Sequence, residues 1–402
     1  MRVCLLLPAY NEAINHKGEP TVILARTIKG YGLGEAGEGR NITHNQKKLN
    51  ENELLYFRDR FNVPLSDGDA GKAPFYRFSE DSKEYKYLIE KRKSLGGFLP
   101  KRTNQPTPLE VPEVSIFEEM LAGTGDREVS TTMSFIRLLT ILTKDKKIGK
   151  HVVPIVPDEA RTFGMDPLFR QLGIYAHRGQ LYDPVDSDQF LYYKEAKNGQ
   201  ILEEGINEAG EISSFIASGM SYSNHGIHMI PFYIYYSMFG FQRVWDFVWA
   251  AGDMRAKGFL LGGTAGRTTL NGEGLQHQDG HSHLAAASTP NIKAYDLAYS
   301  YEIAIVVHRG MQEMVEDNKD VIYYLTLENE NYVHPAIPSG VNDDIIRGLY
   351  KIRSTKNPTV RLLGSGPLMG EAIAAADLLQ NDWGIEPGIW HVTSFSELRT
   401  AP

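Results

Sequence analysis

The sequence is poor in cysteine and in long apolar runs, and each shortage excludes a class of protein. Cys4 is the one cysteine among 402 residues, so an internal disulfide framework is excluded and a reducing compartment is favoured. The longest apolar stretch, residues 229–241, falls well short of the roughly 20 residues that a membrane helix needs. The apolar run at the N-terminus stops at Pro8, too early for an export signal. We therefore expect a cytoplasmic protein.

Positive charge is also in short supply. Lys and Arg number 42 against 50 Asp and Glu, which gives a formal net charge of -8. A mildly acidic chain without a basic block is a poor candidate for binding nucleic acid or an anionic membrane, and we expect neither partner. The hydrophobic share of 42% and the charged share of 23% are typical of a folded globular protein.

From residue 131 onward, apolar runs alternate with segments of helical spacing. Strand-like runs occupy residues 152–156, 229–236, 259–261 and 321–327, and helical patterns occupy residues 131–143, 211–220, 241–257 and 294–315. Strands separated by helices predict an α/β fold with a parallel sheet. A further strand at 360–363 and a helix at 370–379 begin a new unit.

The first hundred residues carry fewer signals. Residues 21–25 read as a strand, and a short helical pattern precedes them at residues 9–16. The polar stretch at 64–112 is punctuated by prolines and is typical of a linker between domains.

Acidic residues stand at two noteworthy places, directly after a predicted strand and directly ahead of a predicted helix. Asp158 and Glu159 directly follow the strand at 152–156, and the carboxyl ends of parallel strands face the ligand crevice of such sheets. An acid pair at a helix N-terminus is an equally good interpretation. Glu208 lies among glycines ahead of a helix, and on its own it is only a first-turn acid.

Three histidines and a carboxylate gather within seven residues, at His277, Asp279, His281 and His283. Such a cluster can bind a transition metal, and a metal-dependent hydrolase would follow from it. No second His or Cys cluster accompanies it. General-acid or substrate-binding chemistry is therefore favoured, and a structural hydrogen-bonded cluster stays open.

Long collinear strings resemble the homodimeric type of pyruvate dehydrogenase E1 component, a thiamine diphosphate-dependent enzyme of the transketolase-like superfamily. The matching strings are residues 20–32, 58–64, 158–165, 204–208, 231–243 and 266–277. The resemblance covers essentially the whole chain except its first few residues. It implies an α/β, parallel-sheet, transketolase-like thiamine diphosphate-binding fold with a complete pyrimidine domain and partial flanking domains.

The resemblance also implies a domain plan. Residues 1–106 correspond to the C-terminal tail of the diphosphate-binding domain plus a linker, 107–337 to the pyrimidine-binding domain, and 338–402 to a truncated start of the C-terminal domain. The family's Gly-Asp-Gly and Asn-Asn elements, which present ligands to Mg²⁺, have no match in the sequence. We therefore expect no metal ligand in this chain, with the Mg²⁺ ligands on a missing N-terminal part, and no activity from the chain alone.

Cofactor contacts are implied at four positions. Glu208 matches the glutamate that contacts N1′ of the aminopyrimidine of thiamine diphosphate, which makes it the central catalytic group. Phe239 matches the aromatic residue that stacks on the aminopyrimidine. Asp158 and Glu159 match acidic residues near the thiazolium ring.

Substrate contacts are implied at four more. Lys29, Tyr236 and His277 match residues that line the pyruvate site, His277 being catalytic as well. His44 matches a catalytic histidine of a mobile loop associated with acetyl transfer to the lipoyl group of dihydrolipoamide acetyltransferase (E2). The resemblance thus implies oxidative decarboxylation of pyruvate by a homodimer. The alternatives are another 2-oxoacid dehydrogenase or transketolase-like enzyme, and a non-catalytic truncated subunit that pairs with full-length E1.

Overall fold

The computed structural model describes residues 6–98, 102–157, 160–185, 193–267, 270, 274–356 and 358–400. The chain divides into two compact units, Met1–Leu99 and Pro100–Pro402, and each is described by itself. The expected boundaries at 106/107 and 337/338 stay predictions. No helix in the described part of the chain is both long and apolar enough to cross a membrane.

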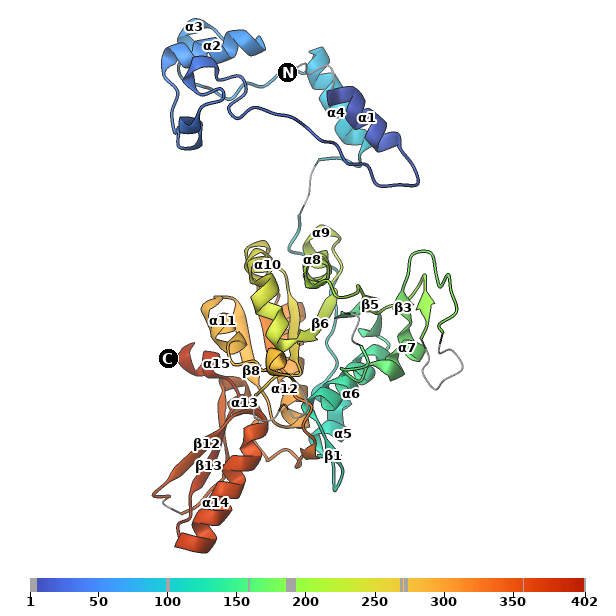
Figure 1. Cartoon of the computed structure of the whole chain (residues 1–402), viewed down its shortest axis with the longest axis vertical. Coiled ribbons are helices and arrows are strands. Elements are labelled where there is room, and N and C mark those ends of the chain that lie inside the picture. The colour runs from blue at the N-terminus through green and yellow to red at the C-terminus, as the bar shows by residue number, and fades with distance from the viewer. Residues whose placement is uncertain are drawn as a thin grey trace. The chain divides into compact units, whose positions relative to one another are not determined.

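A six-stranded sheet forms the centre of the larger unit (Figure 1). Its strands run in the order β5 (Leu202–Glu203), β2 (Val152–Val156), β6 (Ile230–Tyr236), β7 (Gly258–Gly263), β9 (Ile322–Thr326) and β8 (Ile292–Asp296). Every neighbouring pair is parallel. The α/β prediction with a parallel sheet is therefore confirmed.

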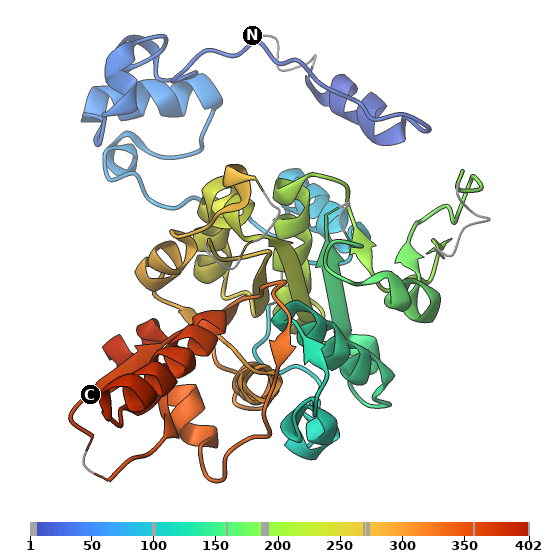
Figure 2. The same cartoon turned by 60° about the horizontal axis from the view of Figure 1, so that its bottom comes forward.

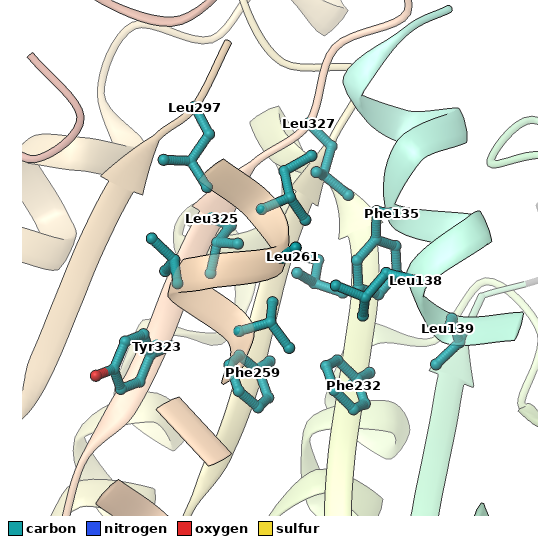
Figure 3. Close-up of a cluster of buried hydrophobic side chains, with 14 of the residues drawn as sticks. Phe135, Leu138, Leu139, Phe232, Phe259, Leu261, Leu297, Tyr323, Leu325 and Leu327 are labelled. Carbon is teal, nitrogen blue, oxygen red and sulfur yellow. The ribbon is translucent and has the colours of Figure 1, made fainter. Parts of the chain in front are cut away.

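Both faces of this sheet are covered by helices, because side chains along each strand alternate between two apolar clusters. Along β6, Phe232 enters one cluster and Tyr233 the other. Helices α6 (Thr131–Lys144) and α12 (Ser300–Met311) contribute to the first cluster, and α8 (Glu208–Gly219), α10 (Gly240–Met254) and α11 (Ser282–Ser288) contribute to the second. Figure 3 shows the first cluster, where the rings of Phe135 and Phe232 lie 5.8 Å apart between centroids.

The strand predictions at β2, β6, β7 and β9 are confirmed, and so are the helices at α6, α8 and α10. The prediction of one helix over residues 294–315 is wrong in its first part. Residues up to Asp296 belong to strand β8, and α12 begins only at Ser300. The carboxylate of Glu302 accepts the N–H groups of Ala298 and Tyr299 and so marks the helix start. Apolar spacing cannot reveal such a boundary, because both elements are buried.

A second, three-stranded sheet follows toward the C-terminus (Figure 2). Its middle strand β13 (Gly388–Val392) pairs antiparallel with β11 (Leu349–Arg353) and parallel with β12 (Arg361–Gly364). The helices here are α13 (Asn342–Arg347), α14 (Met369–Trp383) and α15 (Phe395–Thr400). The predicted strand at 360–363 and helix at 370–379 are thus confirmed, while β11 and α13 had no prediction.

Short elements complete the larger unit. They are α5 (Glu118–Leu121), α7 (Asp166–Leu172), α9 (Ser221–Asn224), the antiparallel pair β1 (Glu128–Val129) and β10 (Tyr332–Val333), and the parallel pair β3 (Ile174–Tyr175) and β4 (Glu195–Ala196).

The smaller unit is helical over the residues that the structure describes. Its helices are α1 (Leu6–Asn15), α2 (Glu51–Phe61), α3 (Asp67–Ala70) and α4 (Lys83–Ser94). The strand predicted at residues 21–25 does not form, and Val22 and Leu24 are 80% and 93% exposed, since a strand needs a pairing partner. The linker predicted at residues 64–112 contains the division between the two units, at residues 99 and 100. Part of it nevertheless folds as α4, which Ser82 caps by accepting the N–H of Tyr85.

Candidate functional site

The candidate site lies where strands of the six-stranded sheet reach their carboxyl ends. Strand β6 ends at Tyr236 and passes through the turn η6 (Ser237–Phe239) into α10. Glu208 is the first residue of α8, soon after β5, and His277 ends the turn η7 (Leu275–His277). The carboxyl edge of a parallel sheet is the usual ligand position in α/β proteins.

Three rings gather at this edge. The ring centroid of Tyr236 lies 5.0 Å from that of His277 and 5.9 Å from that of Phe239, and those of Phe239 and His277 are 5.4 Å apart. All three pairs meet edge to face, a favourable arrangement for aromatic pairs. The structure thus brings together three residues that the sequence singled out.

Arg243 links Glu208 to this ring cluster. Its guanidinium forms an ion pair with the Glu208 carboxylate and lies 4.5 Å from the ring centroid of Phe239. The Glu208 side chain is 12% exposed and that of Arg243 is 47% exposed, so the carboxylate is largely shielded from water while the guanidinium stays half open to it. The sequence analysis missed Arg243. Its position four residues after Phe239, at the start of a helix, was the available signal.

The backbone around the site is set by two local features. Asn207 caps α8, with its side-chain oxygen accepting the N–H of Gly210 at 3.3 Å, which fixes Glu208 in the first turn. Gly240 begins α10 in contact with the ring of Tyr235, where a Cβ atom would overlap that ring. The residue after Phe239 therefore has to be glycine for the turn to close.

Asp279 is a structural residue. Its carboxylate accepts the hydroxyl of Ser237 and the N–H groups of His281 and Ser282. Burial alone would raise the pKa of Asp279, but these hydrogen bonds hold it below its ordinary value. The carboxylate thereby joins the end of β6 to the histidine segment.

The metal interpretation of the histidine segment gains no support. Among the described residues, no group of three or more His, Cys, Asp or Glu side chains could hold a metal ion. The His283 ring forms a 3.2 Å hydrogen bond with the hydroxyl of Thr326 at the end of β9. Asp279 and His283 therefore fit the interpretation of the segment as a structural hydrogen-bonded cluster. Of the three histidines, His277 is the one that packs against the rings of Tyr236 and Phe239.

Lys29 and His44 lie together within the smaller unit. The Nζ atom of Lys29 is 3.1 Å from Nδ1 of His44, and both side chains are exposed. Their expected approach to the substrate stays a prediction. Asp158 and Glu159 lie outside the described residues.

Comparison with solved structures defines the class of protein. Transketolase from Campylobacter jejuni matches 98% of this chain and 55% of its own chain with a TM-score of 0.66 at 16% identity. Transketolase from Leishmania mexicana gives 0.65 at 15% identity. The chain therefore has the transketolase-like α/β fold.

Comparison with sequences then gives the family. A model described as the pyruvate dehydrogenase E1 component middle domain matches residues 109–335. Proteins named pyruvate dehydrogenase E1 component are 57% identical in Pseudomonas aeruginosa and 50% identical in Escherichia coli, each over 97% of this chain. The chain belongs to the pyruvate dehydrogenase E1 family. It spans 45% and 44% of the length of these two relatives.

Proposed function

We propose that this chain supplies the aminopyrimidine and substrate half of a thiamine diphosphate site in a pyruvate dehydrogenase E1 enzyme. The observation that carries the proposal is the largely buried Glu208 carboxylate, which Arg243 links to the rings of Phe239, Tyr236 and His277. The whole enzyme would decarboxylate pyruvate and pass the acetyl group to the lipoyl group of E2. A homodimer is part of the same proposal.

The residues of the site fit the aminopyrimidine of thiamine diphosphate. An acid is required at its N1′ atom, and the Glu208 carboxyl, 12% exposed at the first turn of α8, would hold and return a proton there. Phe239 offers an aromatic ring for stacking. When bound, thiamine diphosphate supplies the carbanion chemistry that amino acid side chains lack.

Tyr236 and His277 would bind pyruvate. Their rings lie 5.0 Å apart, and a phenol and an imidazole can both donate hydrogen bonds to a carboxylate. Lys29 would add a positive charge, and His44 would act in acetyl transfer to the lipoyl group. Asp158 and Glu159 would lie near the thiazolium ring. Mg²⁺ would accompany thiamine diphosphate in the whole enzyme.

The first experiment is pyruvate-dependent reduction of an artificial electron acceptor with thiamine diphosphate and Mg²⁺, without E2. The sample is a hybrid in which this sequence replaces the matching segment of the Pseudomonas aeruginosa relative. We expect turnover by the hybrid and none by the 402-residue chain. Turnover by the chain alone would contradict the half-site proposal, and faster turnover of 2-oxobutyrate than of pyruvate would favour another 2-oxoacid dehydrogenase.

Glu208→Gln in the hybrid tests the proposed acid. An amide keeps the shape of the side chain but cannot take up a proton, so we expect turnover to fall about 100-fold or more. Glu371→Gln is the matched control, because Glu371 is also a first-turn glutamate, on α14, and is exposed. Equal activity of the two variants would remove Glu208 from the mechanism.

A further inference from the structure

A second glutamate lies one helical turn beyond Glu208. Glu211 is fully buried in α8. One carboxyl oxygen, Oε2, accepts the hydroxyl of Tyr233 at 2.8 Å. The other, Oε1, is buried without a hydrogen-bond partner among the described residues.

The surroundings of Glu211 are apolar. Its neighbours Ile212 and Phe215 on α8 belong to the cluster that also holds Ile155 of β2 and Leu260 of β7. An ionised carboxylate in such a place is costly when one oxygen has no donor. A protonated carboxyl is neutral, so it leaves only one unpaired O–H.

Among the residues that the structure describes, the charged and titratable groups that act on Glu211 include no compensating cation. Glu208 and Glu204 both disfavour its ionised form, and on β6 the facing group is the neutral Tyr233. On α10, Arg243 pairs with Glu208. Burial, supported by these two acids and opposed by hydrogen bonds from Tyr233 and the backbone of Asn207, raises the pKa of Glu211 to about 7.

We infer that Glu211 is a positioning residue that controls the protonation of Glu208 by remaining a neutral acid while Glu208 is ionised. This inference rests on the proposed role of Glu208. Residues three apart on a helix share one face, with Cβ atoms about 5–6 Å apart. Ionisation of Glu211 would place a second negative charge beside Glu208 and favour protonated Glu208.

Infrared spectroscopy of the 402-residue chain tests the protonation of Glu211 without cofactor. We expect a C=O band of a protonated carboxyl group that disappears as the pH rises through about 7. Glu211→Gln should remove this band while retaining an oxygen acceptor for Tyr233. A spectrum without a protonated carboxyl at pH 6, or one that Glu211→Gln leaves unchanged, would overturn the inference.

Two further variants test the same carboxyl band by the pH at which it titrates, and they can be used if Glu211→Gln fails to fold. Glu208→Gln removes a neighbouring charge, so the band should titrate at lower pH. Tyr233→Phe removes the hydrogen bond that favours the carboxylate, so the band should titrate at higher pH. A midpoint that neither substitution moves would contradict the coupling.

The hybrid enzyme supplies the functional readout. There, Glu211 ionises as the pH rises through about 7, so the pH–rate profile of the hybrid should change near that pH, and Glu211→Gln should abolish the change. A profile near pH 7 that Glu211→Gln leaves unaltered would overturn the control of Glu208. If the hybrid has no activity at all, the proposed function fails while the infrared result still decides the state of Glu211. If it is active and the band is absent, only this inference fails.

Discussion

The first residue of α12, Ser300, forms hydrogen bonds with the ring of the buried His334. The Nδ1 atom of His334 accepts the N–H of Ser300 at 3.0 Å and lies 2.6 Å from the Ser300 hydroxyl. A nitrogen that accepts a backbone N–H carries no proton, and His334 is 1% exposed. Burial lowers the pKa of His334 to about 4, although the Glu302 carboxylate acts in the opposite direction.

The stability of the protein should therefore fall at mildly acidic pH. Unfolded His334 takes up a proton near pH 6.5 and the folded residue only near pH 4, so the unfolded state binds more protons between these values. Relative to His334→Gln, the wild-type chain should lose up to about 3 kcal/mol of unfolding free energy as the pH falls through this window. Denaturant titrations at several pH values measure the difference.

His228 serves as an internal control for this measurement. Burial lowers its pKa to about 4 as well, and because His228 is present in both proteins, its contribution cancels in the comparison. Parallel stability curves for wild type and variant would show that His334 does not titrate in this window.

Recognition of the individual site residues depended on long matching strings. Glu208, Tyr236, Phe239 and His277 occupy strings of five or more residues, and the structure places all four around the edge of one sheet. Arg243 is the last residue of such a string, yet the sequence analysis assigned it no role. Its role depends on the ring of Phe239 and on the carboxylate of Glu208, which lies 35 residues earlier in the chain.

At the scale of elements, the site depends on the tight passage from β6 into α10. The turn η6 carries Phe239, and the next residue, Gly240, touches the ring of Tyr235. The helix also departs from α geometry at Val244, where φ is -127°, directly after Arg243. Small backbone shifts here would move Phe239 and Arg243 together.

Gly240→Ala should disturb this passage. The added Cβ atom would overlap the Tyr235 ring, and crowding of a well-packed core costs about 1–3 kcal/mol. Activity of the hybrid should fall as well, because Phe239 shifts. Urea denaturation and turnover measure both effects.

Gly370→Ala is the control for that substitution. Gly370 lies within α14 with no atom within 4 Å of an added Cβ, so alanine should stabilise the helix by about 0.5–1 kcal/mol. Loss of stability in both variants alike would mean that contact with Tyr235 is not the cause.

At the scale of the larger unit, a buried acid joins helix α12 to the three-stranded sheet. Glu302 of α12 is fully buried, and its carboxylate accepts the hydroxyl of Tyr350 on β11 and contacts Nδ1 of His391 on β13 at 2.5 Å. The Tyr301 hydroxyl lies 2.6 Å from that of Tyr350. The three-stranded sheet therefore meets α12 through a hydrogen-bonded network.

Tyr350→Phe should weaken this junction. It removes a hydrogen bond to a buried carboxylate and should cost about 1.5–3 kcal/mol of unfolding free energy. Tyr301→Phe removes only the contact between two hydroxyls and should cost about 0.5–1.5 kcal/mol. Urea denaturation of both variants gives the comparison, and an equal cost would mean that Glu302 does not depend on Tyr350.

The sequence by itself determined the family, the parallel α/β sheet and most of the candidate site, because continuous apolar runs and long matching strings are local properties of the chain. Tertiary structure decided the rest. It left residues 21–25 without a strand, since no partner strand pairs with them in the described residues, and it made residues 292–296 a strand by pairing them with β9. It also brought Arg243 to Glu208 and Tyr233 to Glu211. Burial and such neighbours from distant parts of the chain determine how readily a carboxyl group ionises, and a linear sequence does not reveal them.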